Sequence, residues 1–224
     1  MRLFLLIGQS NMAGRGPLEG PDINAEPEKN IYKLDDNGVW LNAKEPVHND
    51  KPELVGVGPG LAFARTVLGT LNGEKIGLIP CAVGGTKIGR WIPGGDLYER
   101  AVSRAWLALE SGQLSGILWA QGESDSELEA DAAVYKDRLF SLIQGLRQEL
   151  AAEEVPFIAA KLGGFIGRKN IRIRARLTGR WSPLLRFLTS SFWQIRLDLP
   201  IKGIICIMTL PRQKNSAGVW LRVG

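Results

Sequence analysis

Short apolar runs alternate with longer amphipathic stretches up to about Gly164, and this alternation constrains the fold more than any other feature. The apolar runs have the length and polar boundaries of buried β-strands; they are Leu3–Ile7, Lys75–Pro80, Ser115–Ala120 and Val155–Lys161. The amphipathic stretches have helical spacing; they are Pro59–Thr70, Asp96–Ser111 and the segment from Leu128 to Leu150. Because strands that alternate with helices form βαβ units, we expect an α/β protein with a doubly wound, mostly parallel sheet flanked by helices.

The remaining N-terminal region carries little periodic signal. Arg15–Glu53 is polar and rich in Pro and Gly, so we expect a long functional loop there.

The apolar run after Arg2 is shorter than the core of a signal peptide, which favours a buried first strand and a cytoplasmic location. Cys81 and Cys206 form neither a disulfide framework nor a metal-ligand spacing. We expect no cofactor.

The charge changes sign sharply near Arg168. Residues 1–167 carry 16 Lys and Arg against 22 Asp and Glu, a net charge of −6, whereas residues 168–224 carry 12 against one, a net charge of +11. We therefore divide the chain into a domain at 1–167 and a basic, irregular tail at 168–224.

Three polar clusters follow predicted strands of the sheet. They are Gly8-Gln9-Ser10-Asn11-Met12, Ala82-Val83-Gly84-Gly85-Thr86, and Gln121-Gly122-Glu123-Ser124-Asp125. Ligands of open parallel sheets bind beyond the carboxyl ends of the strands. A turn at Gly8 can present the Ser10 hydroxyl there, while a glycine N–H and the Gln121 amide can donate hydrogen bonds to a developing oxyanion.

Each cluster also has an ordinary structural interpretation. A serine after a strand is more often a helix cap or turn residue, paired glycines usually form a turn, and Glu123 suits the first turn of a helix. Three such clusters at the ends of strands in one sheet favour a site.

These motifs, with Trp91 after the second, resemble the sialate O-acetylesterase-like branch of the SGNH hydrolases, which includes family 6 carbohydrate esterases that deacetylate xylan. The resemblance covers roughly residues 1–167 and implies a flavodoxin-like three-layer sandwich. It implies Ser10 as the nucleophile of an O-acetylesterase acting on acetylated carbohydrates, without a metal. It also implies oxyanion donors from Ser10, Gly84 or Gly85, and Gln121, with supporting roles for Gln9, Asn11 and Glu123.

The catalytic base implied by the resemblance is missing. The family supplies it from a C-terminal Asp-x-x-His, but the only histidine of this chain is His48, far upstream, and Asp198 has no histidine three residues on. We interpret His48 as a solvated loop residue in preference to the base. Since a serine hydroxyl needs a neighbouring base, we expect impaired esterase activity.

Out-of-frame translation from about residue 168 would explain both the missing base and the charge reversal. Reading the third base of each codon with the first two of the next, Met208-Thr209 can only give an aspartate codon. Permissible codons over Lys202–Thr209 then spell Gly-Asp-Asn-Leu-His-Tyr-Asp, which contains Asp-x-x-His. We treat this as a hypothesis about the tail.

Two other functions remain open from the sequence. The arginines and aromatic residues of the tail superficially suit nucleic-acid binding, although the chain has no nucleic-acid-binding motif and we expect no such partner. A catalytically dead relative is the other alternative, with Trp91 and the Gly84-Gly85 loop as a sugar-binding platform. An aromatic such as Trp91 is more often a packing residue.

Overall fold

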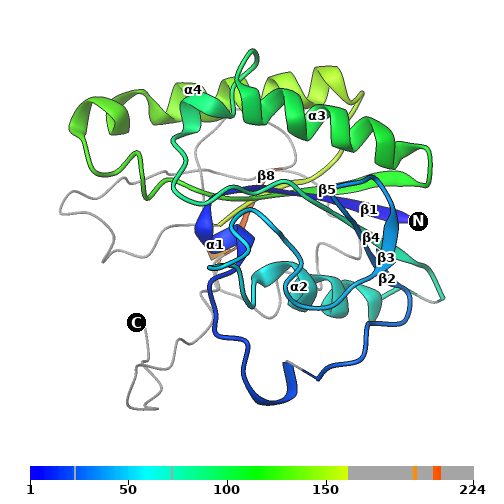
Figure 1. Ribbon diagram of the computed structural model, residues 1–224. Helices are drawn as coiled ribbons and strands as arrows, with labels where there is room; N and C mark the ends of the chain where they lie inside the picture. Colours follow the sequence, from blue (N-terminus) through cyan, green and yellow to red (C-terminus); the bar gives the residue numbers. More distant parts are fainter. Residues whose placement is uncertain (23, 72, 161–193, 196–203, 208–224) are drawn as a thin grey trace.

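An eight-stranded sheet with helices on both faces is the main feature of the fold (Figure 1). The structure is a computed structural model that describes residues 1–22, 24–71, 73–160, 194–195 and 204–207. The strand order is β3-β2-β4-β1-β5-β6-β8-β7. The strands are β1 (Arg2–Gly8), β2 (Ile31–Leu34), β3 (Trp40–Asn42), β4 (Ile76–Pro80), β5 (Gln113–Ala120), β6 (Phe157–Ala160), β7 (Gln194–Ile195) and β8 (Ile204–Ile207). The six central strands are parallel and the two edge strands antiparallel, which confirms the predicted fold class.

Helices α3 (Asp96–Leu109) and α4 (Glu129–Glu149) cover one face of the sheet, and α2 (Pro59–Leu68) covers the other (Figure 1). Acidic residues occupy the first turns of α3 and α4, and Pro59 opens α2, as helix N-termini favour. None of the helices in the described part of the chain is long and apolar enough to span a membrane.

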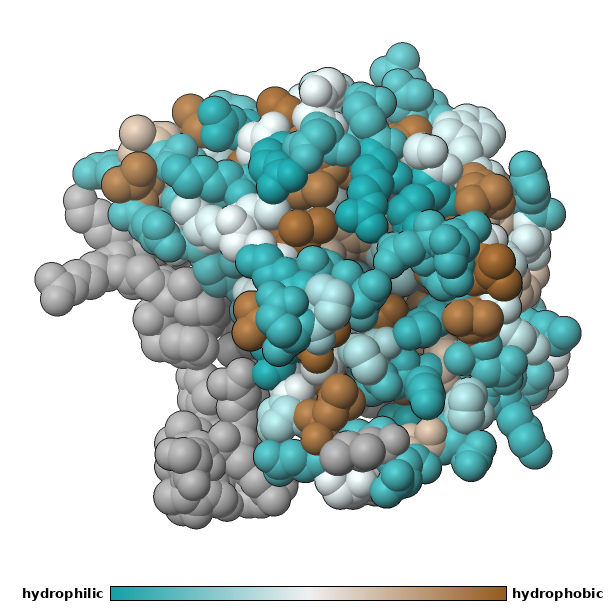
Figure 2. Space-filling model, in the orientation of Figure 1, coloured by the Kyte–Doolittle hydropathy of each residue, from teal (hydrophilic) through white to brown (hydrophobic). Residues whose placement is uncertain are grey.

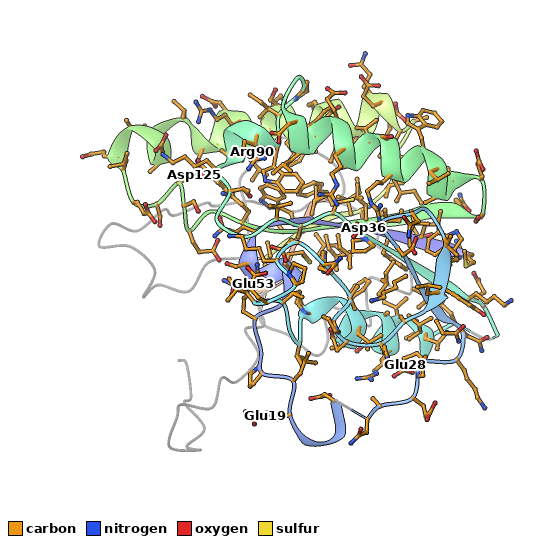
Figure 3. The ribbon with its side chains drawn as sticks, in the orientation of Figure 1. Glu19, Glu28, Asp36, Glu53, Arg90 and Asp125 are labelled. Atoms are coloured by element: carbon orange, nitrogen blue, oxygen red, sulfur yellow. The ribbon has the colours of Figure 1, made fainter. Side chains whose placement is uncertain are left out.

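The central strand β1 contributes to the core on both faces of the sheet. Leu3, Leu5 and Ile7 pack with α3 and α4, whereas Phe4 and Leu6 pack on the α2 side. Side chains fill both layers (Figure 3), so β1 is apolar at nearly every position instead of alternating. On the face drawn in Figure 2, hydrophilic residues predominate and apolar ones are scattered, as on the surfaces of most folded domains.

The prediction of a continuous loop over Arg15–Glu53 is wrong. This segment contains β2 and β3, which pair in an antiparallel hairpin that forms one edge of the sheet. Asp35 closes the turn by accepting the N–H groups of Asn37 and Val39, and Gly38 takes a left-handed φ of 79°. The Asn37-Gly38 pair is a hairpin signal that identifies such a turn from sequence.

The expectation that the chain is irregular after about residue 168 is wrong for six residues. Strand β8 pairs in parallel with β6, and β7 pairs with β8, so both belong to the main sheet. Ile204-Ile205-Cys206-Ile207 is a run with high β-propensity. The other residues of the predicted tail, including Asp198 and Met208-Thr209, lie outside the described residues, and the boundary at 167/168 stays a prediction.

Candidate active site

The carboxyl ends of β4, β1 and β5 meet at one edge of the sheet, with β1 between the other two. The backbone after β1 is hydrogen-bonded on both sides: Val83 N–H donates to Gly8 O (3.0 Å), and Gln9 N–H donates to Ala120 O (2.9 Å). The structure therefore brings the three predicted polar clusters together at the place where doubly wound sheets bind ligands.

Gly8 allows the turn after β1 to pass close to β5. Its φ is 132°, a region that side chains disfavour, and a Cβ there would lie 2.2 Å from Ala120 O. The chain turns at Gly8 and Gln9 and enters the short helix α1 (Ser10–Ala13), which buried Met12 and Ala13 anchor to the core.

Ser10 is the first residue of α1 and is partly exposed. Within the described part of the chain, neither its hydroxyl nor its N–H has a hydrogen-bond partner. Because first-turn N–H groups have no acceptor inside their helix, the Ser10 N–H is available beside its own hydroxyl. This is the arrangement required of a nucleophile that also donates to the oxyanion, and both roles stay predictions.

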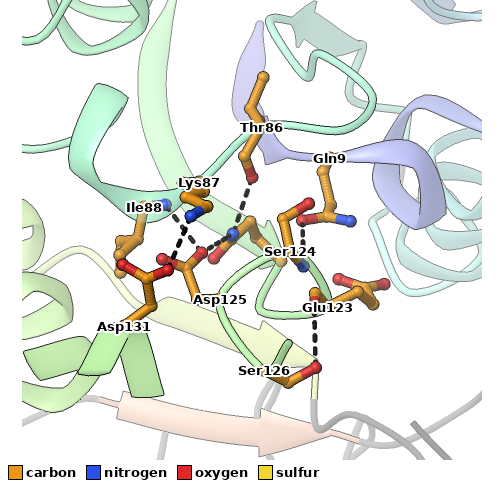
Figure 4. Close-up of polar contacts among 10 residues, drawn as sticks. Gln9, Thr86, Lys87, Ile88, Glu123, Ser124, Asp125, Ser126 and Asp131 are labelled. Atoms are coloured by element: carbon orange, nitrogen blue, oxygen red, sulfur yellow. Dashed lines mark hydrogen bonds and ion pairs between the residues drawn. The ribbon is translucent and has the colours of Figure 1, made fainter. Parts of the chain in front are cut away.

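The loop after β5 packs against the α1 turn through two polar contacts. Asn11 Nδ2 donates to Glu123 Oε1, and Ser124 N–H donates to Gln9 Oε1 at 3.5 Å (Figure 4 shows the second contact). Burial raises the pKa of Glu123, and its second carboxylate oxygen is buried without a hydrogen-bond partner among the described residues. These contacts join the two loops, and the supporting roles of Gln9, Asn11 and Glu123 stay predictions.

Gln121 joins the loop after β5 to the loop after β4. Its amide nitrogen donates to Thr86 O (2.9 Å) and to Asp125 Oδ2 (2.5 Å), and Asp125 Oδ2 also accepts the Ile88 N–H (2.9 Å). Both amide hydrogens are therefore engaged within the protein. Direct donation to an oxyanion would require Gln121 to release one of these acceptors, so that role stays a prediction and a bridging role is what the geometry supports.

The structure contradicts the alternative in which Trp91 forms a sugar-binding platform. Its side chain is fully buried, packs edge-to-face on Trp119 with ring centroids 5.6 Å apart, and donates its Nε1–H to Thr86 Oγ1 (3.0 Å). A residue with no exposed surface cannot form a sugar platform. Its function in the structure is to hold the loop after β4 against the core.

The two glycines of that loop differ in their hydrogen bonding. Gly84 N–H donates to Asp50 Oδ2 at 2.7 Å, whereas Gly85 is exposed, takes a φ of 77°, and its N–H has no partner in the described regions. Of the two predicted glycine donors, Gly85 is the one free to meet an oxyanion.

The interpretation of His48 as a solvated loop residue is wrong. It is 3% exposed, hydrogen-bonds to the backbone of Leu6, and its Nε2 is buried without a partner among the described residues. Burial lowers the pKa of His48 to about 4. A neutral imidazole oriented by the Leu6 backbone, with no hydrogen bond to Ser10, does not form the nucleophile–base pair of a serine esterase.

Asp50, Arg15, Thr86 and Asp125 are site residues that sequence reasoning did not assign. Asp125 closes the third motif, so its place in the cluster was a usable signal, whereas Arg15 and Asp50 lie in a segment without periodicity. Over residues 1–22, 24–71 and 73–160, no group of three or more His, Cys, Asp or Glu side chains is arranged to hold a metal ion.

The family model for "Carbohydrate esterase, sialic acid-specific acetylesterase" matches residues 1–186. The chain belongs to this family. The resemblance inferred from the three motifs is thus confirmed, and the carbohydrate-esterase class with it. A probable carbohydrate esterase of Arabidopsis thaliana is 37% identical over 187 residues, which cover 75% of this chain and 72% of the plant protein.

Solved structures agree with the family. The X-ray structure of that Arabidopsis protein superposes with a TM-score of 0.75 at 30% identity, covering 99% of this chain and 91% of the other. NanS has a TM-score of 0.61 at 21% identity, over 73% of this chain and 68% of NanS. A carbohydrate acetylesterase from Xanthomonas citri gives 0.52 at 20%, over 72% and 41%. The last two show the shared fold alone.

Proposed function

We propose that this carbohydrate esterase removes O-acetyl groups from sugars with Ser10 as its nucleophile, and that the chain as written is impaired because it lacks the catalytic base. One observation carries the proposal: Ser10 lies between the loops after β4 and β5 with its hydroxyl and N–H both unpartnered among the described residues. That position suits attack on an ester carbonyl whose oxygen is bound by backbone amides.

The reaction proceeds in two steps. Ser10 Oγ attacks the acetyl carbonyl, the sugar oxygen leaves with a proton, and an acetyl-serine ester remains; water then attacks that ester, releases acetate and restores the hydroxyl. Each step passes through an oxyanion that the Ser10 N–H and a glycine N–H of the loop after β4 can stabilise. Each step also needs a base to accept a proton from the attacking oxygen.

The base is the part that this chain does not supply in the expected place. His48 is the only histidine of the sequence, and it is buried and bonded to the Leu6 backbone. Serine hydrolases that lose a triad member retain about 10³–10⁴-fold catalysis over water from oxyanion and binding contributions. We therefore expect the chain to hydrolyse 4-nitrophenyl acetate slowly at neutral pH.

Added imidazole tests this proposal on the chain as it exists, because a free imidazole can take the place of the missing base. We expect the hydrolysis of 4-nitrophenyl acetate to rise with imidazole concentration well above the rate of the Ser10→Ala variant under the same conditions. The variant measures the hydrolysis that imidazole catalyses by itself. Equal rates for the two proteins at every imidazole concentration would contradict the role of Ser10.

The natural sugar ester is a separate question within the same proposal. Acetylated sialic acids and acetylated xylan present the same acetyl carbonyl to the nucleophile, and the matched family is described as sialic acid-specific. Acetate release from both, measured with imidazole present and with Ser10→Ala as control, ranks them by kcat/KM.

A further inference from the structure

A buried carboxylate joins the nucleophile turn to the glycine loop. The Asp50 side chain is 1% exposed and accepts hydrogen bonds from two segments: Arg15 Nη2 at 2.6 Å and Nη1 at 3.2 Å, and Gly84 N–H at 2.7 Å. Arg15 follows Gly14, the C-cap residue of α1, and its Nη1 also donates to Gly14 O (2.7 Å). Asp50 thus connects the chain leaving the Ser10 helix to the loop after β4.

The absence of a side chain at Gly84 makes this contact possible. A Cβ at Gly84 would lie 2.4 Å from Arg15 Nη2 and 3.2 Å from Asp50 Oδ2. The ion pair therefore occupies the space that a side chain would need. Gly85, by contrast, has only the Lys51 ammonium near its Cβ position, at 4.0 Å, and its N–H faces no acceptor among the described residues.

We propose that Asp50 is a positioning residue of the esterase: it holds the Gly84 N–H and thereby presents the Gly85 N–H as the oxyanion donor of this loop. This inference rests on the proposed function. A backbone N–H that already donates to a carboxylate is not free for an oxyanion, whereas the N–H of the next peptide is free and follows a residue that Asp50 holds in place. Preorganised donors of this kind need no rearrangement when charge develops in the reaction.

Arg15 balances the negative charge of the Asp50 carboxylate near this site. An unpaired negative charge beside a developing oxyanion would raise its energy, but Asp50 lies within salt-bridge distance of the guanidinium, so the pair has no net charge. Burial acts to raise the pKa of Asp50, yet the hydrogen bonds from Arg15 and Gly84 outweigh it and the pKa lies below its ordinary value. We therefore treat Asp50 as ionised at neutral pH.

Backbone amide NMR of the full chain tests the first half of the proposal without any need for activity. A charge-assisted bond to a buried carboxylate shifts an amide proton strongly downfield, so we expect the Gly84 amide at low field and displaced upfield in Asp50→Asn. Asp96→Asn is the matched control, because it removes the charge of an exposed pair between Asp96 at the start of α3 and Arg90, with both side chains about half exposed. An unchanged Gly84 resonance in Asp50→Asn would overturn the positioning role.

An adduct of Ser10 with the organophosphate paraoxon, formed in the presence of imidazole as the added base, tests the second half, since its phosphoryl oxygen occupies the position of the oxyanion. We expect the Gly85 amide to shift on adduct formation and the Gly84 amide to keep its low-field position. A large shift of Gly84 with Gly85 unmoved would overturn the assignment of the donor. If paraoxon leaves Ser10 unmodified, the proposed function fails and the Gly85 role with it, while the response of Gly84 to Asp50→Asn still decides whether Asp50 holds the loop.

Kinetics separate positioning from a general loss of structure. In imidazole-supported hydrolysis we expect Asp50→Ala to lower kcat by about 10²-fold with KM nearly unchanged, the scale of losing one oxyanion donor. Asp50→Asn keeps an acceptor for Gly84 and should recover part of kcat, even where both variants melt at the same temperature. A kcat that follows melting temperature across Asp50→Ala, Asp50→Asn and Asp96→Asn would assign Asp50 a structural role only, and so would overturn the proposal.

Discussion

Individual residues determine how closely the nucleophile turn approaches its neighbours, and Gly8 is the residue at which the turn passes β5. The turn hydrogen-bonds to Ala120 on one side and Val83 on the other, so it cannot move away from either to admit a side chain. Gly8 therefore carries both a steric and a conformational requirement, and these two costs can be separated by comparison with another glycine.

Gly8→Ala is expected to destabilise the fold by about 3 kcal/mol or more, because the added Cβ would lie 2.2 Å from Ala120 O and the φ of 132° is unfavourable for alanine. Gly94→Ala is the control: its φ is 84° and nothing lies within 4 Å of the Cβ position, so it should cost only about 1 kcal/mol. Urea unfolding measures both. Equal losses in the two variants would show that the close approach to β5 does not matter.

Two titrating residues of the segment between β3 and α2 give the stability opposite dependences on pH. Burial lowers the pKa of His48 to about 4, below its ordinary 6.5, so the stability associated with neutral His48 is present above pH 6.5 and lost as the pH falls towards 4. Burial raises the pKa of Glu45 from 4.5 to about 7, so the stability associated with its protonated form is present below pH 4.5 and lost as the pH rises through 7.

Between pH 4.5 and 6.5 the two residues change the free energy of unfolding with pH in opposite directions, so their effects partly cancel in the unsubstituted protein. Substituting one residue should reveal the pH dependence that comes from the other. In Glu45→Gln the free energy of unfolding should rise with pH across this range, by an amount on the order of 3 kcal/mol from His48. In His48→Asn it should fall. Denaturant unfolding at several pH values measures both. Two variants with the slope of the unsubstituted protein would refute these shifts.

At the scale of elements, a buried polar network connects the end of β5 to the loop after β4 and to α4. Tyr135 of α4 donates its hydroxyl to Gln121 O (2.8 Å) and accepts the Trp119 Nε1–H (3.2 Å). Asp125, fully buried, accepts from Gln121 and from the Ile88 N–H. The site loops are therefore held by hydrogen bonds from within the core and depend little on contacts at the surface.

Asp125→Ala should destabilise the protein by about 3–5 kcal/mol, since it leaves the Ile88 N–H and a Gln121 amide hydrogen buried without an acceptor. Asp131→Ala is the matched control, because the Lys87–Asp131 pair lies in the same region but at the surface, where an ion pair contributes about 0–1 kcal/mol. Thermal and urea unfolding compare them. Similar losses would show that the Asp125 contacts are dispensable.

The sequence predicted the elements whose apolar pattern is strong and missed those whose signal is local. The strands β1, β4, β5 and β6 and the helices α2, α3 and α4 fall where periodicity placed them, within a few residues at each end. The β2–β3 hairpin was missed because both strands are short and partly exposed, and only Asn37-Gly38 marked the turn.

The sequence predicted which residues lie at one edge of the sheet, but not the hydrogen bonds that they make. Strand ends place Ser10, Gly85 and Gln121 at one edge because parallel strands share their carboxyl edge. The hydrogen bonds that the site residues make, in contrast, join segments that are far apart in the sequence. The Asp50–Gly84 contact and the burial of Trp91 and His48 are of this kind, and no local pattern encodes them.

At the scale of the whole molecule, the domain is acidic up to residue 167 and the remainder is strongly basic. The family match extends to residue 186, and β7 and β8 belong to the main sheet. Neither observation tests the predicted boundary at 167/168. The hypothesis of out-of-frame translation rests on the charge reversal, on the obligatory aspartate codon at Met208-Thr209, and on the missing Asp-x-x-His.

Reading the gene in the alternative frame from about residue 168 should give Asp-x-x-His in the region now read as Lys202–Thr209. A protein expressed in that frame should hydrolyse 4-nitrophenyl acetate without added imidazole, faster than the present chain by several powers of ten, because the base is restored. Sequencing the DNA checks the first expectation and initial rates the second. An alternative frame without this motif would end the hypothesis.

The central claim is that Ser10 is the nucleophile, and the most direct measurement is peptide mapping by mass spectrometry after reaction of the intact chain with paraoxon in the presence of imidazole. We predict a diethylphosphoryl group on the peptide that contains Ser10, attached to that residue, and its absence from the Ser10→Ala protein. Modification confined to other residues, or equal labelling of both proteins, would contradict the claim.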